Sequence, residues 1–546
     1  MNYLLPLQQF SHRVEQNPEQ AYLHQPVNSQ WNTYSFKDVD VMARKIASGL
    51  LAQGYQKGER IAILAHNCAE WIVTDIAIMM AGMISVPIYP SANAKTIKHV
   101  LSHSGAKAVF VGKVDDASAA ASACQTLNKI ALPYPTIDPD FHWNNWLDNY
   151  APLTQINHPD ENDVLTIIYT SGSTGVPKGV VLTHDNIAAG IRGLDDWFVD
   201  SHNRILSYLP MAHIAERSFA IMGSIYNSTE VFFNESRETF VQDLHYAQVT
   251  LFASVPRLWT NFQSQVFSQI KDGDLQQLLK TDQSLKVAAQ IRQKLGFKHC
   301  KRFISGTAPI SPGLLNWYHQ IGIDIYEAWG MTETSGAACK NSQFLEERLG
   351  CIGVPVKGVE MKLSDQGEIL IRGDSVFDEY YQNPEANKEE FEQGWFKTGD
   401  CGSFDEHGIW KIIGRLKEQF KSAKGKYVAP VPIESLVLDN PYIEQTCVMG
   451  SGMRQPVALV VLNVENSREN DEIVDSLNLF LAKLNSELES HEKLAALFVV
   501  ESPWTVANEL LTATMKLKRM SIESKYREDL IAVNPSGVVW EEEVVY

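Results

Sequence analysis

The sequence predicts an α/β protein with a large N-terminal domain of parallel-rich sheets covered by helices, an antiparallel subdomain, and a small α+β C-terminal domain. Apolar runs of strand length alternate with helical patterns through much of the N-terminal half. Short alternating strands then flank a turn at 364–367, and the pattern changes again after Lys417. Alternation of strands and helices is typical of parallel sheets covered by helices. We therefore expect residues 1–416 to form the large domain and residues 417–546 the small one.

The elements of the large domain follow one another in a β-α-β rhythm. Apolar residues at helical spacing or in short runs, bounded by Gly and Pro, set the approximate limits of each element. In chain order they predict helix 36–53, strand 60–65, helix 70–81, strand 84–88, helix 96–104, strand 108–111, strand 164–168, strand 179–183, strand 231–233, helix 240–247, strand 251–254 and strand 323–326.

The last part of the large domain differs from what precedes it. Two alternating segments, 360–363 and 368–371, lie on either side of the turn 364–367 and predict an antiparallel pair. Beyond Lys417 the pattern becomes a compact α+β arrangement of about 130 residues, the size of one small domain. We place the domain boundary near Lys417.

Composition excludes several classes of function. The 546 residues include 47 basic and 65 acidic side chains, a formal charge of −18, which argues against non-specific binding to nucleic acid or to an anionic membrane face. The 7 cysteines are scattered without a Cys-x-x-Cys pair, so we expect neither a disulfide framework nor a zinc site. No signal peptide or apolar run of membrane-spanning length is evident. We expect a cytoplasmic protein without a transmembrane segment.

The segment Tyr169–Gly179 gathers hydroxyls, glycines and one lysine between two predicted strands, so it is a strand-to-strand turn. Glycines let the backbone approach a ligand and turn its N–H groups toward it, while hydroxyls and a lysine bind anionic oxygens. We expect this turn to hold the phosphates of ATP. The residues that we expect to contact them are Thr170, Ser171, Gly172, Ser173, Thr174, Gly175 and Lys178.

A Walker A loop is the obvious alternative for this segment. That motif needs glycine directly before its lysine, Ser or Thr directly after it, and a helix beyond. Here Pro177 precedes Lys178, Gly179 follows it, and a strand comes next. A polar surface loop is the other alternative, and short clusters of turn-forming residues usually are such loops. The ordered string of hydroxyls and glycines argues against it.

A second candidate segment, Tyr326–Thr334, follows the predicted strand 323–326 and contains an aromatic residue, a glycine, a hydroxyl and a carboxylate. Trp329 can stack on adenine and Gly330 allows a close approach. Thr332 can bond a phosphate oxygen, and Glu333 can ligate Mg2+ through oxygen. Taken singly, each residue would more often be structural.

Further polar residues lie downstream. Asp400, at the end of a Thr-Gly-Asp run, and Arg415, after the strand-turn-strand centred on 405–408, could bond the two hydroxyls of a ribose. Thr-Gly-Asp alone is a common turn. Lys516 lies in a basic stretch, 511–519, whose spacing alone favours a solvated run of charge.

Taken together and in this order, these motifs resemble those of the adenylate-forming superfamily, enzymes that activate carboxylic acids as acyl-AMP, and most closely the long-chain fatty acyl-CoA synthetases. The resemblance implies that the turn at 169–179 holds the triphosphate and that Asp400 holds the ribose. The segment 305–309 also resembles the adenine-side loop of these enzymes. The nucleotide-binding residues implied outside the turn are Gly306, Thr307, Ala308, Glu327, Trp329, Gly330, Asp400 and Arg415.

The resemblance also assigns the catalytic residues. His213, in the segment 209–213, matches a histidine that borders the acyl pocket. The segment 415–430 resembles the hinge of long-chain synthetases, and the segment 255–259 also resembles that subfamily. The resemblance implies that Lys417 is the hinge residue, about which a mobile C-terminal lid rotates between adenylation and thiolation. Lys516 would serve adenylation, and Gly425 would enter the site for thiolation. Lys516, Glu333, Thr332, Lys417 and His213 are thus the implied catalytic residues.

The implied activity is ATP-dependent conversion of a medium- to long-chain fatty acid to acyl-AMP and then acyl-CoA, with ATP, Mg2+ and coenzyme A as cosubstrates or cofactors and without nucleic acid. Peripheral contact with the inner membrane face would suit a lipid substrate, although no amphipathic basic helix indicates it. The alternatives are an acyl-AMP ligase that loads a carrier protein, an amino-acid-activating domain, a kinase or ATPase, and a non-catalytic ATP-binding protein.

Overall fold

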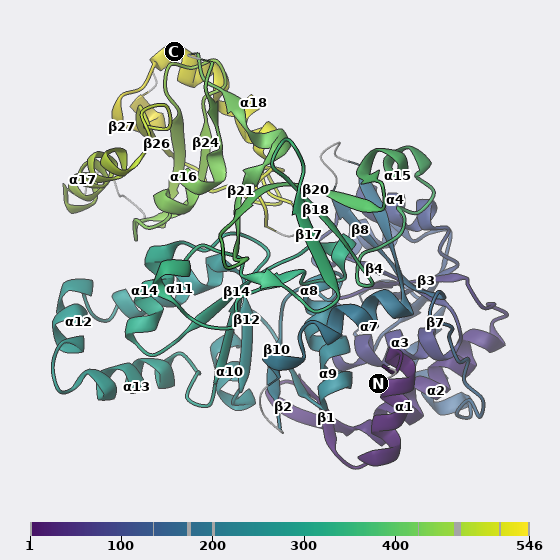
Figure 1. The fold of residues 1–546 in the computed structure, drawn as a ribbon. Coiled ribbons are helices and arrows are strands. Elements are labelled where there is room, and N and C mark those ends of the chain that lie inside the picture. Colours follow the sequence, from purple (N-terminus) through teal and green to yellow (C-terminus); the bar gives the residue numbers. More distant parts are fainter. Residues whose placement is uncertain are drawn as a thin grey trace.

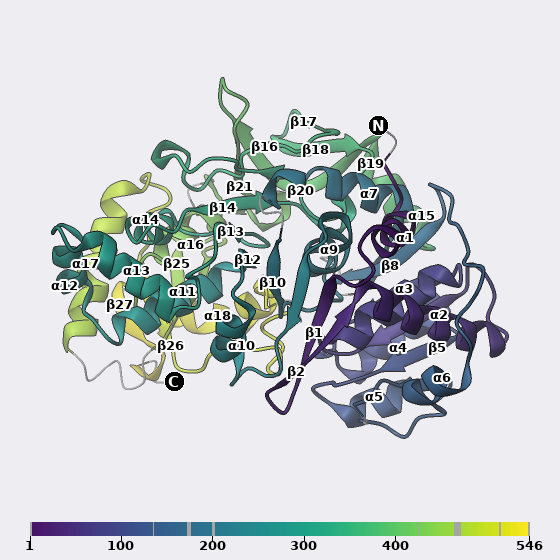
Figure 2. The ribbon, with the colours of Figure 1, turned by 90° about the horizontal axis from the view of Figure 1, so that it is seen from below.

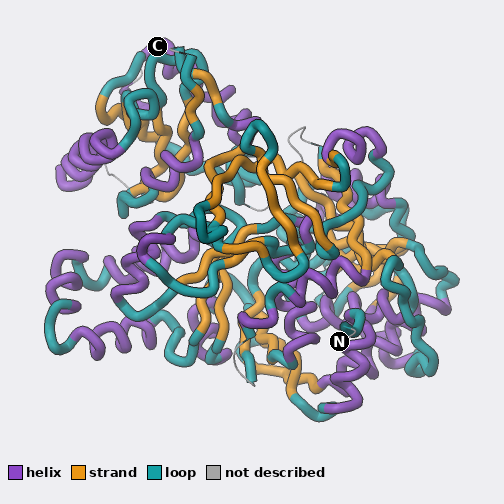
Figure 3. Tube along the Cα trace, viewed as in Figure 1, coloured by secondary structure: helices purple, strands orange, loops and turns teal. Residues whose placement is uncertain are grey.

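The N-terminal part of the chain is built on sheets whose centres are parallel, as the sequence predicts. The computed structural model describes residues 3–134, 136–171, 176–198, 202–423, 425–463, 471–512 and 515–543. Figure 3 shows strands at the centre of this part, with helices around them. Within the described residues no helix is both long and apolar enough to cross a lipid bilayer.

The largest sheet has seven strands in the order β7-β6-β5-β3-β4-β8-β9, and its only antiparallel pair is β8–β9. Its strands are β3 (Arg60–Leu64), β4 (Ile84–Ile88), β5 (Ala108–Val111), β6 (Asn128–Ala131), β7 (Phe141–His142), β8 (Val164–Ser171) and β9 (Pro177–Thr183). The helices of this part of the chain are α1 (Pro6–Gln16), α2 (Phe36–Ala52), α3 (Ala69–Met80), α4 (Ala94–Ser104), α5 (Ala117–Ala123), α6 (Trp143–Asn149) and α7 (His184–Arg192).

Two further sheets also have parallel pairs at their centres. In one, β1, from the start of the chain, pairs in parallel with β11 in the order β10-β11-β1-β2. The other runs β12-β13-β14-β15-β16. Their strands are β1 (Ala21–Val27), β2 (Gln30–Ser35), β10 (Arg204–Ser207), β11 (Glu230–Phe233), β12 (Leu251–Ser254), β13 (Arg302–Ser305), β14 (Ile325–Trp329), β15 (Cys339–Lys340) and β16 (Val354–Pro355).

Short and medium helices connect these strands. The helical elements are η1 (Asp195–Trp197), α8 (Ile214–Glu216), the π-helix η2 (Arg217–Met222), α9 (Gly223–Asn227), α10 (Phe240–Ala247), α11 (Pro256–Phe267), α12 (Asp272–Leu279), α13 (Ser284–Lys294), α14 (Pro312–Gln320), η3 (Thr332–Thr334) and η4 (Glu346–Arg348). The predicted limits of β14, residues 323–326, were wrong. It begins at Ile325 because that residue pairs with Phe303 of β13, and it continues to Trp329 because β15 pairs with its end.

The antiparallel subdomain is confirmed. It runs β17-β18-β20-β19, and β21 pairs with β20. Its elements are β17 (Val359–Leu363), β18 (Glu368–Gly373), α15 (Pro384–Glu390), β19 (Phe391–Glu392), β20 (Trp395–Phe404) and β21 (Trp410–Arg415). The turn between β20 and β21 is fixed by Asp405, whose carboxylate accepts hydrogen bonds from the amides of His407 and Ile409, each at 2.9 Å.

The C-terminal part has its own mixed sheet, β24-β25-β26-β27, and its own apolar core. Its elements are η5 (Leu416–Glu418), β22 (Phe420–Lys421), β23 (Tyr427–Val428), α16 (Pro430–Val437), β24 (Ile443–Met449), β25 (Val457–Leu462), α17 (Asp471–Glu487), β26 (Ala496–Val500), α18 (Arg519–Val533), β27 (Gly537–Trp540) and η7 (Glu541–Glu543). Figures 1 and 2 show it beside α11 and α14, with β21 leading into it. This separate core supports a boundary near Lys417, which stays a prediction.

An ion pair lies at the centre of the N-terminal core. Every residue of α3 is buried, and Asp75 of this helix contacts Arg217 of η2, with Arg217 Nη2 2.7 Å from Asp75 Oδ1. Arg217 Nη2 also donates to the hydroxyl of Ser85 at 2.8 Å. Among the described residues its Nε and Nη1 have no hydrogen-bond partner. Asp75 is therefore the main group that compensates the buried positive charge of the guanidinium.

We expect Asp75→Asn to lower the free energy of unfolding by about 3–5 kcal/mol, because it leaves a buried cation without its counter-charge. The matched control is Glu19→Gln at the exposed Lys37–Glu19 pair, whose loss should cost at most about 1 kcal/mol. Urea unfolding of both variants measures the difference. Equal midpoints for the two variants would show that the Asp75–Arg217 pair does not stabilise the core.

Candidate active site

The predicted phosphate-binding turn is a β-hairpin between β8 and β9. Thr170 pairs with Lys178 and Ser171 with Pro177, so the chain reverses between 171 and 177. Helix α4 holds both of its ends: His99 Nε2 hydrogen-bonds the carbonyl oxygen of Pro177 at 3.1 Å, and His103 Nδ1 lies 2.7 Å from the hydroxyl of Tyr169. The predicted residues Gly172, Ser173, Thr174 and Gly175, and the side chain of Ser171, lie outside the described residues.

Lys178 has protein partners that the sequence did not reveal. Its Nζ lies 3.2 Å from Glu390 Oε1 and 4.8 Å from the centre of the Tyr380 ring. The Tyr380 hydroxyl donates to Glu333 Oε1 at 2.9 Å. Lys178, Tyr380 and Glu333 therefore join the hairpin to the second predicted segment. No motif or spacing links residue 178 to 380 or 390, so only the fold could reveal these contacts.

Glu333 and Thr332 lie in η3, directly after β14, and both are buried. Burial raises the pKa of Glu333, and the hydrogen bond from Tyr380 and the charge of Arg415 oppose the rise. Among the described residues no three His, Cys, Asp or Glu side chains gather as a metal site. A single buried carboxylate suits Mg2+ that takes its remaining ligands from phosphate and water. Glu333 therefore fits the predicted role.

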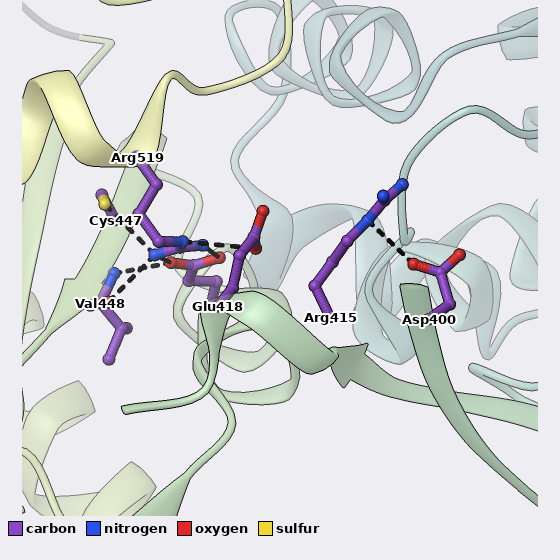
Figure 4. A network of polar contacts seen from close by, with 7 residues as sticks. Asp400, Arg415, Glu418, Cys447, Val448 and Arg519 are labelled. Atoms are coloured by element: carbon purple, nitrogen blue, oxygen red, sulfur yellow. Dashed lines mark hydrogen bonds and ion pairs between the residues drawn. The ribbon is translucent and has the colours of Figure 1, made fainter. Parts of the chain in front are cut away.

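Asp400 connects Trp329 with Arg415. The indole Nε1 of Trp329 donates to Asp400 Oδ2 at 2.9 Å, and Arg415 Nε lies 2.8 Å from Asp400 Oδ1. Asp400 and Arg415 face each other across β20 and β21, and Figure 4 shows the contact. Burial raises the pKa of Asp400, and the charge of Arg415 and the hydrogen bond from Trp329 partly offset this rise. The sequence predicted bonds from Asp400 and Arg415 to the two hydroxyls of a ribose, and the structure adds that these two side chains bond each other.

The segment after β13 lies next to the segment after β14. These strands are parallel neighbours, so their carboxyl ends meet at one edge of the sheet. Gly306 approaches the neighbouring strand so closely that an added Cβ would lie 3.2 Å from the carbonyl oxygen of Ala328. Thr307 has a φ of 70°, a conformation that non-glycine residues rarely adopt. The segment 306–308 thus starts beside the end of β14, and Ala308 is exposed. That these residues line a nucleotide pocket with Trp329 stays a prediction.

Glu327 has a partner within the protein. The amide of Gly350 donates to its Oε2 at 3.1 Å. Burial raises its pKa to about 8, although this hydrogen bond and the charge of Lys411 oppose the rise. A contact between Glu327 and nucleotide stays a prediction.

The absence of a side chain at Gly330 is required by the protein itself. A Cβ there would overlap the carbonyl oxygen of Gly336 and lie 2.8 Å from the Cα of Ala337. The sequence suggested that this glycine admits a ligand, but the close approach seen here is between two stretches of backbone. Gly330 therefore sets the shape of the turn that carries Thr332 and Glu333.

We expect Gly330→Ala to lower the thermal midpoint of the N-terminal domain by roughly 5 °C or more, because backbone atoms must move to admit a methyl group. Gly273→Ala is the control, since an added Cβ in α12 meets no atom within 4 Å. Differential scanning calorimetry of the two variants checks the prediction. A midpoint for Gly330→Ala equal to that of the control would contradict it.

Lys516, from the C-terminal part, faces these N-terminal residues. It lies on a tight turn, where its amide donates to Thr512 Oγ1 at 3.1 Å and Leu511 pairs with Leu517. Solvent reaches its side chain, yet surrounding protein removes enough hydration to lower its pKa, as does the charge of Arg415. The charges of Asp400 and Glu333 oppose this. Because water still reaches it, the shift is smaller than in a sealed site.

His213 is a further side chain near Lys516. Its Nδ1 accepts a hydrogen bond from the amide of Ala215 at 3.1 Å, at the start of α8. Burial and the charge of Lys516 lower its pKa to about 3, so the ring is neutral at physiological pH. The structure therefore gathers Lys516, Asp400, Glu333 and His213, which lie far apart in the sequence.

The predicted hinge is clamped on both sides. On the N-terminal side Arg415 contacts Asp400, and on the C-terminal side Glu418 Oε2 lies 3.4 Å from Arg519 Nε. Arg519 is itself held by both carboxylate oxygens of Glu434, at 2.7 and 2.9 Å. Figure 4 shows these two clamps side by side. Lys417, between them in η5, is exposed to solvent.

Gly425 lies in the exposed turn between β22 and β23, with a φ of 74°. Its amide donates to the carbonyl oxygen of Ser422 in the same turn. The entry of Gly425 into the N-terminal site stays a prediction.

Known proteins resemble this chain along nearly its whole length. A model of the AMP-binding enzyme family matches residues 10–381, and a model of the AMP-binding enzyme C-terminal domain matches residues 417–533. Long-chain-fatty-acid–CoA ligase FadD15 of Mycobacterium bovis is 28% identical over 578 residues, 96% of this chain and 96% of that protein. Fatty acyl-CoA synthetase A of Dictyostelium discoideum is 30% identical over 566 residues, 90% of this chain and 84% of that protein.

Solved structures share the fold. The adenylation domain of the carboxylate reductase of Mycobacterium chelonae has a TM-score of 0.82 at 21% identity, over 97% of this chain and 91% of that one. The o-succinylbenzoate CoA synthetase of Bacillus subtilis, in complex with its acyl-adenylate intermediate, has a TM-score of 0.75 at 21% identity, over 96% of this chain and 99% of that one. The α/β fold with a small C-terminal domain is therefore confirmed.

Proposed function

This chain belongs to the AMP-binding enzyme family, and on that basis we propose that it activates a medium- to long-chain fatty acid with ATP and transfers the acyl group to coenzyme A. The names of its relatives, a long-chain-fatty-acid–CoA ligase and a fatty acyl-CoA synthetase, support the substrate class. One observation carries the proposal: Asp400 bonds Trp329 and Arg415, and the charge of Lys516 from the C-terminal part acts on this group of residues and on His213. These groups suit a site that binds nucleotide beside a carboxylic acid.

In the proposed first step, a carboxylate oxygen of the fatty acid attacks the α-phosphorus of ATP, and the bond to pyrophosphate breaks. Negative charge gathers on the phosphoryl oxygens, so a preorganised cation lowers the barrier. Lys516 supplies that cation. The neutral ring of His213 borders the acyl carboxylate without neutralising it, which leaves the carboxylate nucleophilic.

The other residues bind and orient ATP. The hairpin at 170–178 holds the phosphates, and Trp329 stacks on adenine between the segments 306–308 and 330–332. Asp400 accepts from the ribose hydroxyls, and Arg415 exchanges part of its contact with Asp400 for the nucleotide. Glu333 would ligate Mg2+, and Mg2+ when bound neutralises phosphate charge. Thr332 would bond a phosphate oxygen.

In the proposed second step, the thiol of coenzyme A attacks the acyl carbonyl carbon and AMP leaves. One site must then receive pyrophosphate first and a thiol afterwards, so a rotation of the C-terminal lid, residues 417–546, about Lys417 offers a way to exchange the two. The rotation would withdraw Lys516 and bring Gly425 into the site. The hinge is short, since β21 ends at Arg415 and β22 begins at Phe420. A carrier-protein ligase would be favoured by inserted sequence there.

Fatty-acid-dependent exchange of pyrophosphate into ATP tests the proposal. We expect exchange with Mg2+ and a long-chain fatty acid, and none when the fatty acid is left out. A hydroxamate trap for acyl-AMP provides an independent reading of the same step. Exchange that depends on an amino acid, or ATP hydrolysis to ADP, would contradict the proposal.

A further inference from the structure

A short segment of the C-terminal domain contacts the N-terminal domain at two places away from the nucleotide site. Glu444, at the start of β24, forms an ion pair with Arg257 of α11. Asp439, in the connection from α16 to β24, packs against Gly313 of α14. Both contacts cross between the domains, and both come from the segment 439–444. In Figure 1, α11 and α14, which carry Arg257 and Gly313, lie beside the C-terminal domain, and β21 leads into it.

The contact at Gly313 depends on the absence of a side chain. A Cβ at this position would lie 2.9 Å from Asp439 Cγ, and its three nearest atoms would all belong to the Asp439 carboxylate. That carboxylate lies beside Ser311, the N-cap residue of α14, and against Gly313 in its first turn. These groups form the first turn of α14, where unpaired amides and the helix dipole favour an anion. An aspartate from one domain thus packs against the N-terminal end of a helix of the other.

The interface is polar and loosely packed. A crevice of about 250 Å³ lies along it, between α11, α12 and α14 on one side and residues 438–441 on the other. Arg257 and Glu444 keep 36% and 24% of their side-chain area exposed. Exposed ion pairs contribute at most about 1 kcal/mol each. An interface of this kind can define one orientation and still release within a catalytic cycle.

We propose that Arg257, Gly313, Asp439 and Glu444 form a domain latch that selects the orientation in which Lys516 faces the N-terminal site. These are positioning residues, since none of them touches the reacting atoms. Lys516 and Gly425 belong to the same domain, so the latch must open before Gly425 can replace Lys516. This inference rests on the proposed function, and it predicts that weakening the latch affects the two half-reactions differently.

Gly313→Ala tests the steric half of the latch. Alanine suits a helix better than glycine does, and the added methyl group meets only Asp439 among its nearest neighbours, so α14 should fold normally. We expect pyrophosphate exchange to fall by about 10-fold, while thioester formation from preformed acyl-AMP is unchanged or faster. Asp439→Ala in the same chain removes the clash but also the carboxylate contact, so the double variant should recover to the level of Asp439→Ala alone, above that of Gly313→Ala. Gly273→Ala is the matched control.

A charge exchange tests the ionic half. Arg257→Glu and Glu444→Arg, taken singly, place like charges together and should each lower pyrophosphate exchange by about 5-fold. The double variant restores opposite charges and should recover exchange to within about 2-fold of the unmodified protein. Recovery in the double variant separates a pairwise contact from separate folding defects.

Small-angle X-ray scattering provides a reading that does not depend on the substrate. We expect Gly313→Ala and Glu444→Arg to increase the radius of gyration, and the two compensating double variants to reverse the increase. Equal losses in both half-reactions, no loss in either, or failure of both double variants to recover would overturn the latch. Failure of the unmodified protein to exchange pyrophosphate with any fatty acid would overturn the proposed function, while scattering would still test the latch.

Discussion

Lys516→Ala is expected to slow acyl-AMP formation by about 100-fold or more, equivalent to roughly 2.7 kcal/mol of transition-state stabilisation. The ammonium is the cation that the C-terminal domain presents to Asp400 and Glu333. Its charge acts where negative charge develops on the phosphoryl group. Thioester formation from preformed acyl-AMP should change far less, because the proposed rotation withdraws Lys516 from the site for that step. Single-turnover assays of the two half-reactions make the comparison.

Two controls accompany this variant. Lys518→Ala removes a neighbouring cation from the same basic stretch and should leave both half-reactions nearly unchanged. The lowered pKa of Lys516 means that it loses its proton at a lower pH than an ordinary lysine, so adenylation should decline earlier on the alkaline side. Lys516→Arg should move that decline to higher pH. Equal losses in adenylation and thioester formation would contradict the assignment of Lys516 to the first step.

Lys417→Pro is expected to suppress thioester formation by about 100-fold while sparing adenylation. Proline fixes φ near −65° and restricts the residue before it, so the chain between the two hinge clamps can no longer adopt a second conformation. The exposed Lys417 side chain is not needed for packing, and Lys417→Ala should therefore keep most of both activities. Coenzyme A turnover equal to that of the unmodified protein would count against a rotation about this residue.

Local sequence patterns predicted most elements of the fold. Strand 108–111 and helix 240–247 agree with β5 and α10 at both ends, because apolar periodicity and flanking turn residues set their limits. The limits of β14 could not be predicted in this way. Pairing with β13 and β15 determines where it ends, and pairing is a property of the assembled sheet.

Candidate site residues that belong to a sequence motif could be proposed from the sequence. Residues that reach the site only through long-range packing could not. Hydroxyls and glycines identified the hairpin after β8, and the Thr-Gly-Asp run identified Asp400. Tyr380, Glu390 and Arg519 belong to no such motif, yet they contact Lys178, Glu333 and Glu418. The sequence did not reveal that Gly330 lies against the backbone of Gly336 and Ala337. Contacts between residues far apart in the chain need the folded structure.

Product analysis tests the central claim most directly. The full chain is incubated with ATP, Mg2+ and fatty acids from butyrate to stearate, with and without coenzyme A, and AMP, pyrophosphate, ADP and acyl-CoA are measured. We predict AMP, pyrophosphate and acyl-CoA in equal amounts with the longer acids, and acyl-AMP with pyrophosphate but no acyl-CoA when coenzyme A is left out. Formation of ADP, or no turnover with any fatty acid, would contradict the assignment as an AMP-forming fatty acid–CoA ligase.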